Sequence, residues 1–287
     1  MANLKEIRSR ITSVGSTMQI TSAMKMVSAA KLKRAQDAIT QMRPYANKLT
    51  ELLENLSASL DSSDGGVYSQ NREGNKTLII TITSNRGLCG GFNASIIKKT
   101  KELIDKEYQK SSVSILSVGK KSSEHFDKNG FNVVGRHDSI FSDLNFENVA
   151  IIAEDVMRKF VAGDYDKVML VYNQFKNAAT QIVMTENFLP VQTPKNQEIS
   201  SGDYIFEPTK NEIIDQLVPK SLKTQLFKAV LDSHAAEHGA RMTAMHKATD
   251  NAGELKKELT LTYNKARQAA ITGEILEIVG GAEALNG

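Results

Sequence analysis

The stretch of residues 3–60, NLKEIRSRITSVGSTMQITSAMKMVSAAKLKRAQDAITQMRPYANKLTELLENLSASL, decides the fold. Its apolar residues recur at alternating steps of three and four, which is the heptad pattern of a coiled coil. The pattern predicts one helix, roughly 85 Å long at about 1.5 Å per residue. A compact domain built from this chain is far narrower, so most of the helix must leave any globular body. The heptad positions are Leu4, Ile7, Ile11, Val14, Met18, Leu32, Ala35, Ile39, Met42, Ala46, Leu49, Leu53, Leu56 and Leu60.

In the middle of this segment the heptad register meets polar side chains. We therefore expect the apolar seam to be interrupted over residues 21–28. The register falls there on Thr21, Lys25 and Ser28, while Met24, Met26 and Val27 point elsewhere. Farther along, Pro44 should bend the helix or leave one carbonyl unpaired.

A second long helix is predicted from Pro208 almost to the end of the chain. Ala, Leu, Met, Lys and Glu dominate from residue 220 onward, and all are strong helix formers. Pro219 should kink or restart this helix, which would reach roughly 110 Å. Its heptad-like positions are Met245, Ala248, Ala252, Leu255, Leu259, Thr262, Ala266, Ala269 and Leu276, with Gly273 inside the pattern. The two helices would pair antiparallel with each other; intermolecular coiled coils in a homo-oligomer are the open alternative.

Between the helices, after a Ser-, Asp-, Gly- and Asn-rich linker at 61–76, the pattern changes to that of an α/β domain. Buried strands are predicted at 77–83, 113–118 and 167–175, with helices at 92–109, 120–129 and 145–162, and an antiparallel edge strand at 180–191. Alternating strands and helices predict a parallel sheet between helices. The predicted fold class is α+α/β: a long antiparallel coiled coil plus a small Rossmann-like domain. The predicted domains are 1–72, 73–207 and 208–287, the last pairing with 1–60.

The composition excludes several classes of protein. Of 287 residues, 40% are hydrophobic and 24% charged, which argues against wholesale disorder. The single cysteine, Cys89, excludes a disulfide within the chain and a Cys-based zinc site. There is no tryptophan and there are only five prolines, so the helices can run uninterrupted. Neither a membrane-spanning run nor a secretory signal is visible, so we expect no direct insertion into the bilayer.

The small net charge of +3 conceals an uneven distribution. Residues 1–36 hold seven basic residues against one acidic residue, Glu6, a local net charge of +6. The seven are Lys5, Arg8, Arg10, Lys25, Lys31, Lys33 and Arg34. Such a basic stripe favours an acidic partner surface; the less favoured alternative is a solvated helix face. Nucleic acid is not expected as a partner, because no aromatic residues lie between the charges.

Two elements could carry chemistry, and for each we favour a structural interpretation. His234, Glu237 and His238 match the H-x-x-E-H pattern of some zinc peptidases. A catalytic zinc site needs a third ligand and a pocket, so we expect polar residues on a helix surface and no metal. Residues 86–91, RGLCGG, follow a strand and precede a helix, yet neither nucleotide-binding glycine pattern is present. We expect a tight structural turn with no cofactor.

Cys89 lies in that turn. As a nucleophile it would need a nearby base, for which the sequence offers His125 and His137. Nothing in the sequence fixes their geometry, so a small, partly buried thiol is the better interpretation. No constellation predicts an active site, and the chain is interpreted as a mechanical or scaffolding protein without catalytic residues.

Three separated motifs closely resemble the gamma subunit of the bacterial F-type ATP synthase. They are IRSRITSVGSTMQITSAMKMVSAAKLKRAQ (7–36), TSNRGLCGGFN (83–93) and ARMTAMHKATDNAGELKKELTLTYNKARQAAITGEILEIVGGA (240–282). The resemblance implies a central rotor shaft. Its coiled coil would stand inside the hexameric head of alpha and beta subunits, and its α/β foot would lie against the epsilon subunit and the membrane c-ring. The protein would be peripheral, on the cytoplasmic face of the cell membrane, and would itself bind no nucleotide.

The same resemblance implies roles for particular residues. Contacts with beta subunits would be made by Met24, Arg241, Arg267, Gln268, Thr272 and Glu274. An acidic loop of those subunits would face the basic stripe of Arg8, Arg10, Lys25, Lys31, Lys33 and Arg34. Tyr204 and Glu207 would touch the c-ring, and the mostly apolar tip from Ile275 to Leu285 would turn in an apolar sleeve. The alternatives are a stand-alone coiled-coil scaffold with an α/β docking domain and, more remotely, an enzyme.

Overall fold

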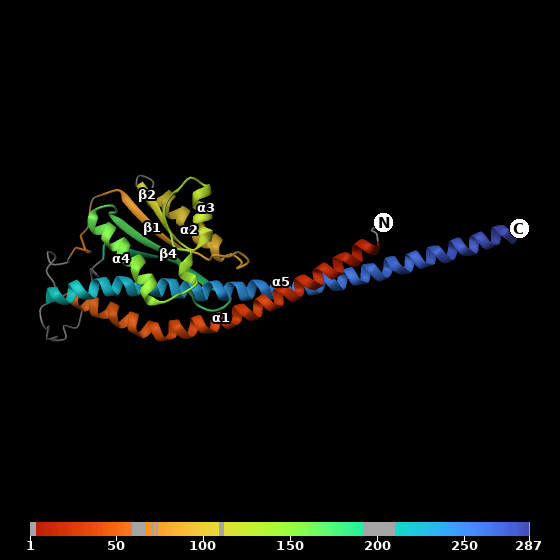
Figure 1. The fold of residues 1–287 in the computed structure, drawn as a ribbon, viewed down its shortest axis with the longest axis horizontal. Helices are drawn as coiled ribbons and strands as arrows, with labels where there is room; N and C mark the ends of the chain where they lie inside the picture. The colour runs from red at the N-terminus through yellow and green to blue at the C-terminus, as the bar shows by residue number, and fades with distance from the viewer. Residues whose placement is uncertain are drawn as a thin grey trace. The chain divides into compact units, whose positions relative to one another are not determined.

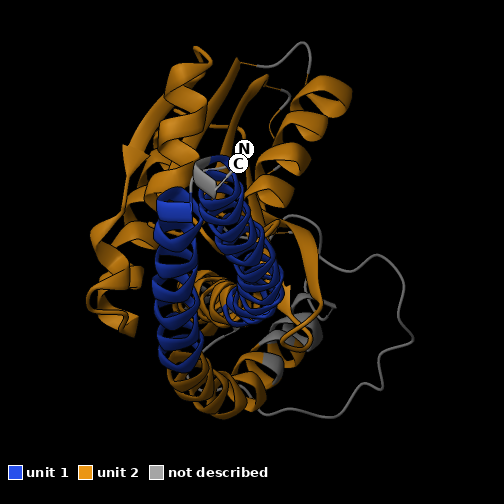
Figure 2. Cartoon of the chain, turned by 90° about the vertical axis from the view of Figure 1, so that its right-hand side faces the viewer, with its two compact units in different colours: residues 1–28, 242–287 blue, residues 29–241 orange. Residues whose placement is uncertain are grey.

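The computed structural model describes residues 4–58, 67–70, 72, 74–108, 112–191 and 210–286. The chain has two compact units, coloured separately in Figure 2. Unit 1 consists of residues 1–28 and 242–287, and unit 2 of residues 29–241. The predicted domain limits of 1–72, 73–207 and 208–287 follow the chain rather than these units, and they stay a prediction.

Two long helices run at the ends of the chain (Figure 1). Helix α1 spans Leu4–Ala58, and helix α5 spans Lys210–Asn286. Both helices contain a proline, Pro44 in α1 and Pro219 in α5. The expectation that Pro219 restarts its helix is wrong, because α5 is one continuous element on both sides of it. Pro208 and the linker up to residue 66 lie outside the described residues.

Within unit 1 the two helices pair antiparallel. Thr21 Oγ1 accepts a hydrogen bond from Thr249 Oγ1 at 2.8 Å, and Lys25 Nζ lies 3.4 Å from His246 Nδ1. A Cβ at Gly15 would lie 3.7 Å from Lys256 Nζ, so the partner number rises as the α1 number falls. This register confirms the antiparallel pairing predicted from the heptads.

The predicted interruption of the apolar seam over 21–28 is one of polarity and not of burial. Thr21 is 9% exposed and Ser28 3% exposed, so these two register positions stay buried, while the third, Lys25, is half-buried. Each hydroxyl bonds to a carbonyl of its own helix, Thr21 to Met18 and Ser28 to Met24. Small polar side chains can therefore replace apolar ones in the seam without leaving a hydroxyl unsatisfied. Met26 and Val27 do point outward, as predicted.

Farther out on α5 the heptad pattern does not translate into burial. Met245 and Ala252 are buried, but Leu255 is 45% and Leu276 66% exposed, which corrects the predicted seam. At the observed register the first residue of α1, Leu4, comes opposite about Arg267, counting one residue of α5 per residue of α1. The remainder of α5 has no α1 residue opposite it. In unit 2, the buried α1 heptad positions are Leu32, Ala35, Ile39, Ala46 and Leu49.

The α/β part of unit 2 is a five-stranded sheet in the order β3-β2-β1-β4-β5. The strands are β1 Lys76–Ile82, β2 Ser112–Val118, β3 Asn132–Arg136, β4 Lys167–Phe175 and β5 Gln181–Leu189. All neighbours are parallel except β4 and β5, so the predicted parallel sheet and antiparallel edge strand are confirmed. Strand β3 was not predicted, because NVVGR is short and only half-buried.

Helices cover both faces of this sheet. They are α2 Phe92–Glu107, α3 Lys120–Lys128 and α4 Phe146–Ala162, close to their predicted limits. A short 3-10 helix, η1 Ser139–Phe141, precedes α4. Alternate strand residues point to opposite faces, so Leu78 and Ile80 join the core under α4, while Ile79 joins the core under α2. This arrangement, together with the paired long helices, confirms the predicted fold class.

Candidate functional site

The place where an α/β sheet of this kind binds ligands is taken by helix α5. The chain leaves β1 toward β2 on one side and later crosses to β4 on the other, so the topological switch point lies between β1 and β4. Open α/β sheets bind ligands in the crevice outside the carboxyl ends of the strands at this point. In α5, Leu226 and Val230 belong to the core under α4, whereas Ala236 and Ala240 belong to the core under α2.

Helix α5 therefore passes from one face of the sheet to the other across residues 231–235. The crossing lies at the carboxyl end of β1, because Ser233 Oγ donates to the carbonyl oxygen of Ile82, the last residue of β1, at 3.4 Å. A Cβ at Gly239 would lie 3.2 Å from Ala178 Cα and 3.3 Å from Phe175 Cε2. The backbone of α5 thus lies directly on the loop that follows β4, and only a residue this small fits without a shift.

Arg241 on α5 binds the glycine turn that follows β1. Its Nη2 donates to the carbonyl oxygens of Arg86 and Gly87, at 3.1 and 3.3 Å, and its Nη1 lies 2.5 Å from Glu237 Oε1. The side chains of Arg241 and Glu237 are only 10% and 11% exposed. Burial raises the pKa of Glu237, and the guanidinium of Arg241 opposes that rise. The turn presents carbonyl oxygens to a cation here, which is the opposite of an anion-binding loop.

The turn itself is tight, as the sequence predicts. Leu88 has φ +62° and is 66% exposed, and Gly90 has φ +59°. Cys89 between them is buried, and its Sγ accepts from Asn93 Nδ2 at 3.2 Å and lies 3.7 Å from Ser84 Oγ. Burial raises the pKa of the Cys89 thiol, so the sulfur is not activated as a nucleophile.

The predicted bases for that thiol have other neighbours. The ring of His125 meets that of Phe126 edge-on at 5.4 Å, and the backbone N–H of His137 donates to Ser117 at 2.9 Å. Burial lowers the pKa of both imidazoles. The interpretation of residues 86–91 as a structural turn therefore has direct geometric support.

The expectation that the H-x-x-E-H residues lie on a helix surface is wrong. His238 is 6% exposed, and its Nε2 lies 3.3 Å from Nε2 of His234. The ring of His234 also stacks at 5.8 Å on Phe141. Burial lowers the pKa of His234 to about 4 and that of His238 to about 3. Glu237 pairs with Arg241, and no group of three metal-ligating side chains occurs among the described residues.

The side chains that the family resemblance singled out lie mostly in the open. Arg267, Gln268, Thr272 and Glu274 on α5 are exposed, and Met24 on α1 is half-buried. Arg241 differs from them, because it is bound within the chain. Tyr204 and Glu207 lie outside the described residues. Leu285 belongs to α5, but its side chain is not described.

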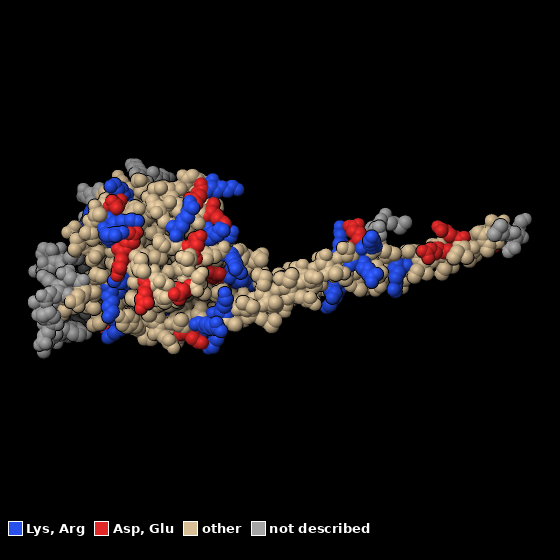
Figure 3. All heavy atoms as spheres, viewed as in Figure 1, with Lys and Arg blue, Asp and Glu red and all other residues tan. Residues whose placement is uncertain are grey.

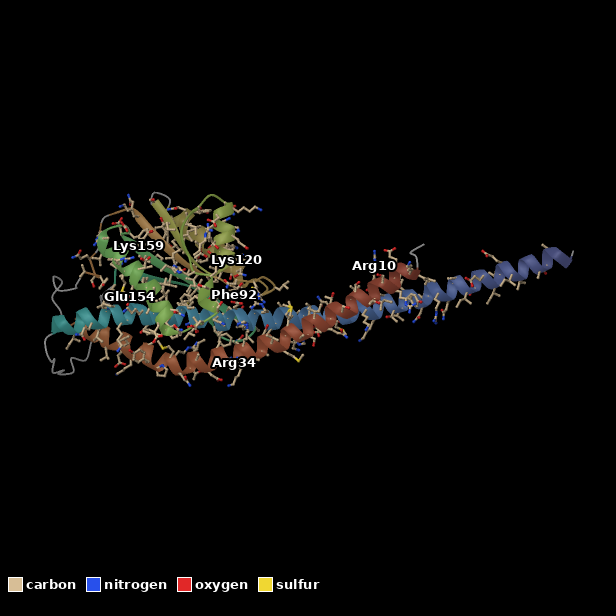
Figure 4. All side chains as sticks on the ribbon, viewed as in Figure 1. Arg10, Arg34, Phe92, Lys120, Glu154 and Lys159 are labelled. Atoms are coloured by element: carbon tan, nitrogen blue, oxygen red, sulfur yellow. The ribbon has the colours of Figure 1, made fainter. Side chains whose placement is uncertain are left out.

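In the basic stripe, five of six side chains are exposed and Lys25 is half-buried. Arg10 pairs with Glu6 at 2.8 Å and Lys33 with Asp37 at 2.9 Å, both one helical turn apart. Figure 3 shows the exposed charges, and Figure 4 labels Arg10 and Arg34 on α1. Exposed pairs of this kind are worth little, so these cations are available to a partner.

The long helix α5 fills the ligand crevice of the α/β domain, and the two terminal helices pair with each other; together these features define a coiled-coil protein with a small α/β domain. Within the described residues no helix is long and apolar enough to cross a membrane. The family model described as "ATP synthase" matches residues 3–285. The chain therefore belongs to this ATP synthase family.

The similarity to individual relatives extends over the full length. The chain is 65% identical over 288 residues to the ATP synthase gamma chain of Flavobacterium johnsoniae, covering 100% of both chains. It is 52% identical over 297 residues to that of Cytophaga hutchinsonii, again with 100% of both covered. These matches confirm the resemblance drawn from the three sequence motifs. The chain belongs to the ATP synthase gamma-chain family, and it is a central-stalk rotor subunit without catalytic residues of its own.

Solved structures agree on the fold. A chain of the Tetrahymena thermophila mitochondrial ATP synthase central stalk and c-ring matches with a TM-score of 0.61 and 27% identity, covering 80% of this chain and 99% of that one. A chain of the Euglena gracilis mitochondrial ATP synthase, from a structure of OSCP, F1 and the c-ring, matches with a TM-score of 0.70 and 21% identity, covering 98% and 94%.

Proposed function

We propose that this subunit couples ion flow through a membrane c-ring to ATP synthesis or hydrolysis in a head of alpha and beta subunits. The observation that carries the proposal is the full-length identity of 65% to a gamma chain, across both helices and the α/β domain. Ring rotation would turn the α/β foot, and the helices would carry that rotation into the head. Their asymmetric profile would then drive the beta sites through different nucleotide affinities.

The proposed contacts with beta subunits use Met24, Arg267, Gln268, Thr272 and Glu274. The exposure of the last four suits a surface that meets and leaves its partner at every step. A contact that must break repeatedly cannot be strong, and exposed polar contacts contribute only about 0–1 kcal/mol each. Arg241 is only 8% exposed, so a contact with a beta subunit would have to use the small accessible part of its guanidinium.

The exposed apolar residues beyond Arg267 support a second contact, with an apolar sleeve in the head. Ile271, Ile275, Leu276, Ile278 and Val279 are between 48% and 71% exposed. Apolar side chains form no directional bonds with a sleeve, so they permit rotation. The basic stripe would meet an acidic loop of the beta subunits.

The foot would contact the epsilon subunit and the c-ring, the latter through Tyr204 and Glu207. These assignments rest on the family resemblance. The protein would then lie at the cytoplasmic face of the cell membrane as a peripheral subunit. The proposed domain limits 1–72, 73–207 and 208–287 would separate shaft from foot.

Reconstitution tests the proposal. The purified chain is mixed with alpha, beta and epsilon subunits, the complex is joined to c-ring membranes, and ATP hydrolysis and ATP-driven membrane potential are both measured. We expect a stable complex that hydrolyses ATP and generates a potential. Failure to form a complex with alpha and beta subunits would refute the rotor function and favour the stand-alone scaffold.

A further inference from the structure

A buried carboxylate on α5 meets an arginine of α1 at the end of a central strand of unit 2. The side chain of Asp232 has no exposed surface, and its Oδ1 accepts from Arg43 Nη2 at 3.2 Å. The same Nη2 donates to the carbonyl oxygen of Phe175, the last residue of β4, at 3.3 Å. One guanidinium nitrogen therefore joins both long helices and the sheet.

A neighbouring set of hydrogen bonds fixes the same face of α5 to the edge of the sheet. Gln225 lies two helical turns before Asp232, and its Nε2 donates to Glu186 Oε2 and to the carbonyl oxygen of Asn187, each at 3.2 Å. Tyr172 Oη donates to the other oxygen of Glu186 at 2.6 Å. Helix α5 is thus held through Gln225 and through Asp232. Arg43 connects α1 to the second of these two points.

This ion pair is poorly explained as a source of stability. Asp232 Oδ2 is buried without a hydrogen-bond partner among the described residues, and burial raises the pKa of this carboxyl group. Only the carboxylate is buried, because the Arg43 side chain is 45% exposed, and an ion pair that desolvates a carboxylate seldom stabilises a fold more than apolar side chains of similar volume do. What the ion pair adds over apolar packing is a hydrogen bond with a defined direction. Apolar contacts along a seam permit helices to slide or turn, whereas a hydrogen bond requires a defined distance and angle.

We propose that Arg43 and Asp232 form a torque clamp, a positioning pair that fixes the rotational setting of α1 and α5 against the sheet. The inference rests on the proposed rotor function, since only a loaded shaft needs this resistance to twisting. The clamp acts when the membrane potential opposes rotation. Unloaded ATP hydrolysis makes little use of it.

The test uses the assembled complex in vesicles and compares ATP hydrolysis with the membrane potential that it generates, read from a voltage-sensitive dye. We expect Arg43→Met to lower the potential reached per ATP hydrolysed severalfold, with hydrolysis in detergent unchanged. Arg158→Met is the matched control, because Arg158 bonds to Asp155 within α4 and is 77% exposed. It should couple like the wild type.

The double variant Arg43→Met/Asp232→Leu separates positioning from stability. Arg43→Met alone leaves the buried carboxylate unpaired and should lower the melting temperature. In the double variant, apolar packing should restore a melting temperature near the wild-type value, while the potential reached per ATP hydrolysed stays low. If the double variant couples normally, packing alone suffices and the clamp is refuted.

Two further outcomes also decide the matter. Should Arg43→Met fail to assemble, Asp232→Leu removes the hydrogen-bond acceptor of the pair and leaves the half-exposed Arg43 in place; full coupling by this variant would refute the clamp. A wild-type chain that does not assemble or couple would instead contradict the rotor function itself, so the two failures are distinguishable.

Discussion

At the residue scale, the most informative side chains are the buried histidines. A pattern that suggests metal binding in the sequence is, in the structure, a neutral pair packed against Phe141 and close to Arg241. Since burial lowers the pKa of His234 to about 4 and that of His238 to about 3, both imidazoles are uncharged at neutral pH in the folded state. The unfolded chain protonates both near the ordinary histidine pKa of about 6.5.

This difference makes stability depend on pH in a defined direction. Below about pH 6.5 the two histidines bind protons in the unfolded chain but not yet in the folded chain. The free energy of unfolding therefore falls as the pH drops toward 3. Each unit of pKa difference is worth about 1.4 kcal/mol. We expect His234→Leu/His238→Leu to flatten this dependence in urea titrations between pH 7 and pH 4. Asn251→Leu, which changes an exposed residue without an ionisable side chain, should leave the slope unaltered; equal slopes in all three proteins would contradict the prediction.

At the element scale, α5 serves as shaft and as the filler of the sheet's own crevice. Two of its glycines, Gly239 and Gly273, have very different surroundings. Gly239 lies where the helix backbone meets the loop after β4, whereas a Cβ at Gly273 would meet nothing within 4 Å. Glycine weakens a helix, so its presence at the contact has a steric reason and its presence at Gly273 has none in this chain.

The same substitution should therefore have opposite effects at the two positions. Gly239→Leu forces a side chain against Phe175 and Ala178, and overpacking of this kind costs about 1–3 kcal/mol. Gly273→Leu gains helix propensity of about 0.5–1 kcal/mol. Urea denaturation followed by circular dichroism measures both. If Gly239→Leu is as stable as the wild type, the helix does not press on the loop as the structure shows.

At the scale of the whole molecule, charge placement matters more than net charge. The chain carries only +3, yet its first helix holds a cluster of exposed cations that includes Lys31, Lys33 and Arg34. Electrostatic attraction between complementary surfaces acts mainly on the association rate, and salt screens it over about 8 Å at physiological ionic strength.

Neutralising these three residues should slow assembly. We expect Lys31→Gln/Lys33→Gln/Arg34→Gln to lower the association rate with the alpha–beta head at low salt, and the deficit should shrink as salt is added. Lys98→Gln/Lys101→Gln/Lys106→Gln on α2 removes the same charge elsewhere and serves as the control. Equal slowing by both triple variants in stopped-flow binding would show that net charge, and not the stripe, governs association.

Much of the fold could be predicted because its helices and strands follow from the local periodicity of apolar residues. The heptad spacing from Leu4 onward and the apolar runs of β1, β2 and β4 depend on neighbours a few residues away. Strand β3 escaped prediction because it has only five residues, NVVGR, and among them only two adjacent valines are strongly apolar. In the candidate site, the tight turn at 86–91 was predictable from its glycines. That Arg241 binds the carbonyl oxygens of this turn was not predictable.

By itself, the sequence determined that two helices, each too long to lie within the small α/β domain, flank a mainly parallel sheet. Its motifs also identified the family. The tertiary structure alone decided which polar residues are buried. Thr21 fills the seam, Arg241 closes the glycine turn, and Asp232 meets Arg43 across about 190 residues of chain. Helix and strand follow from steps of three, four or two along the chain. Burial of a charge depends on which distant group lies opposite it, and local periodicity carries no record of that partner.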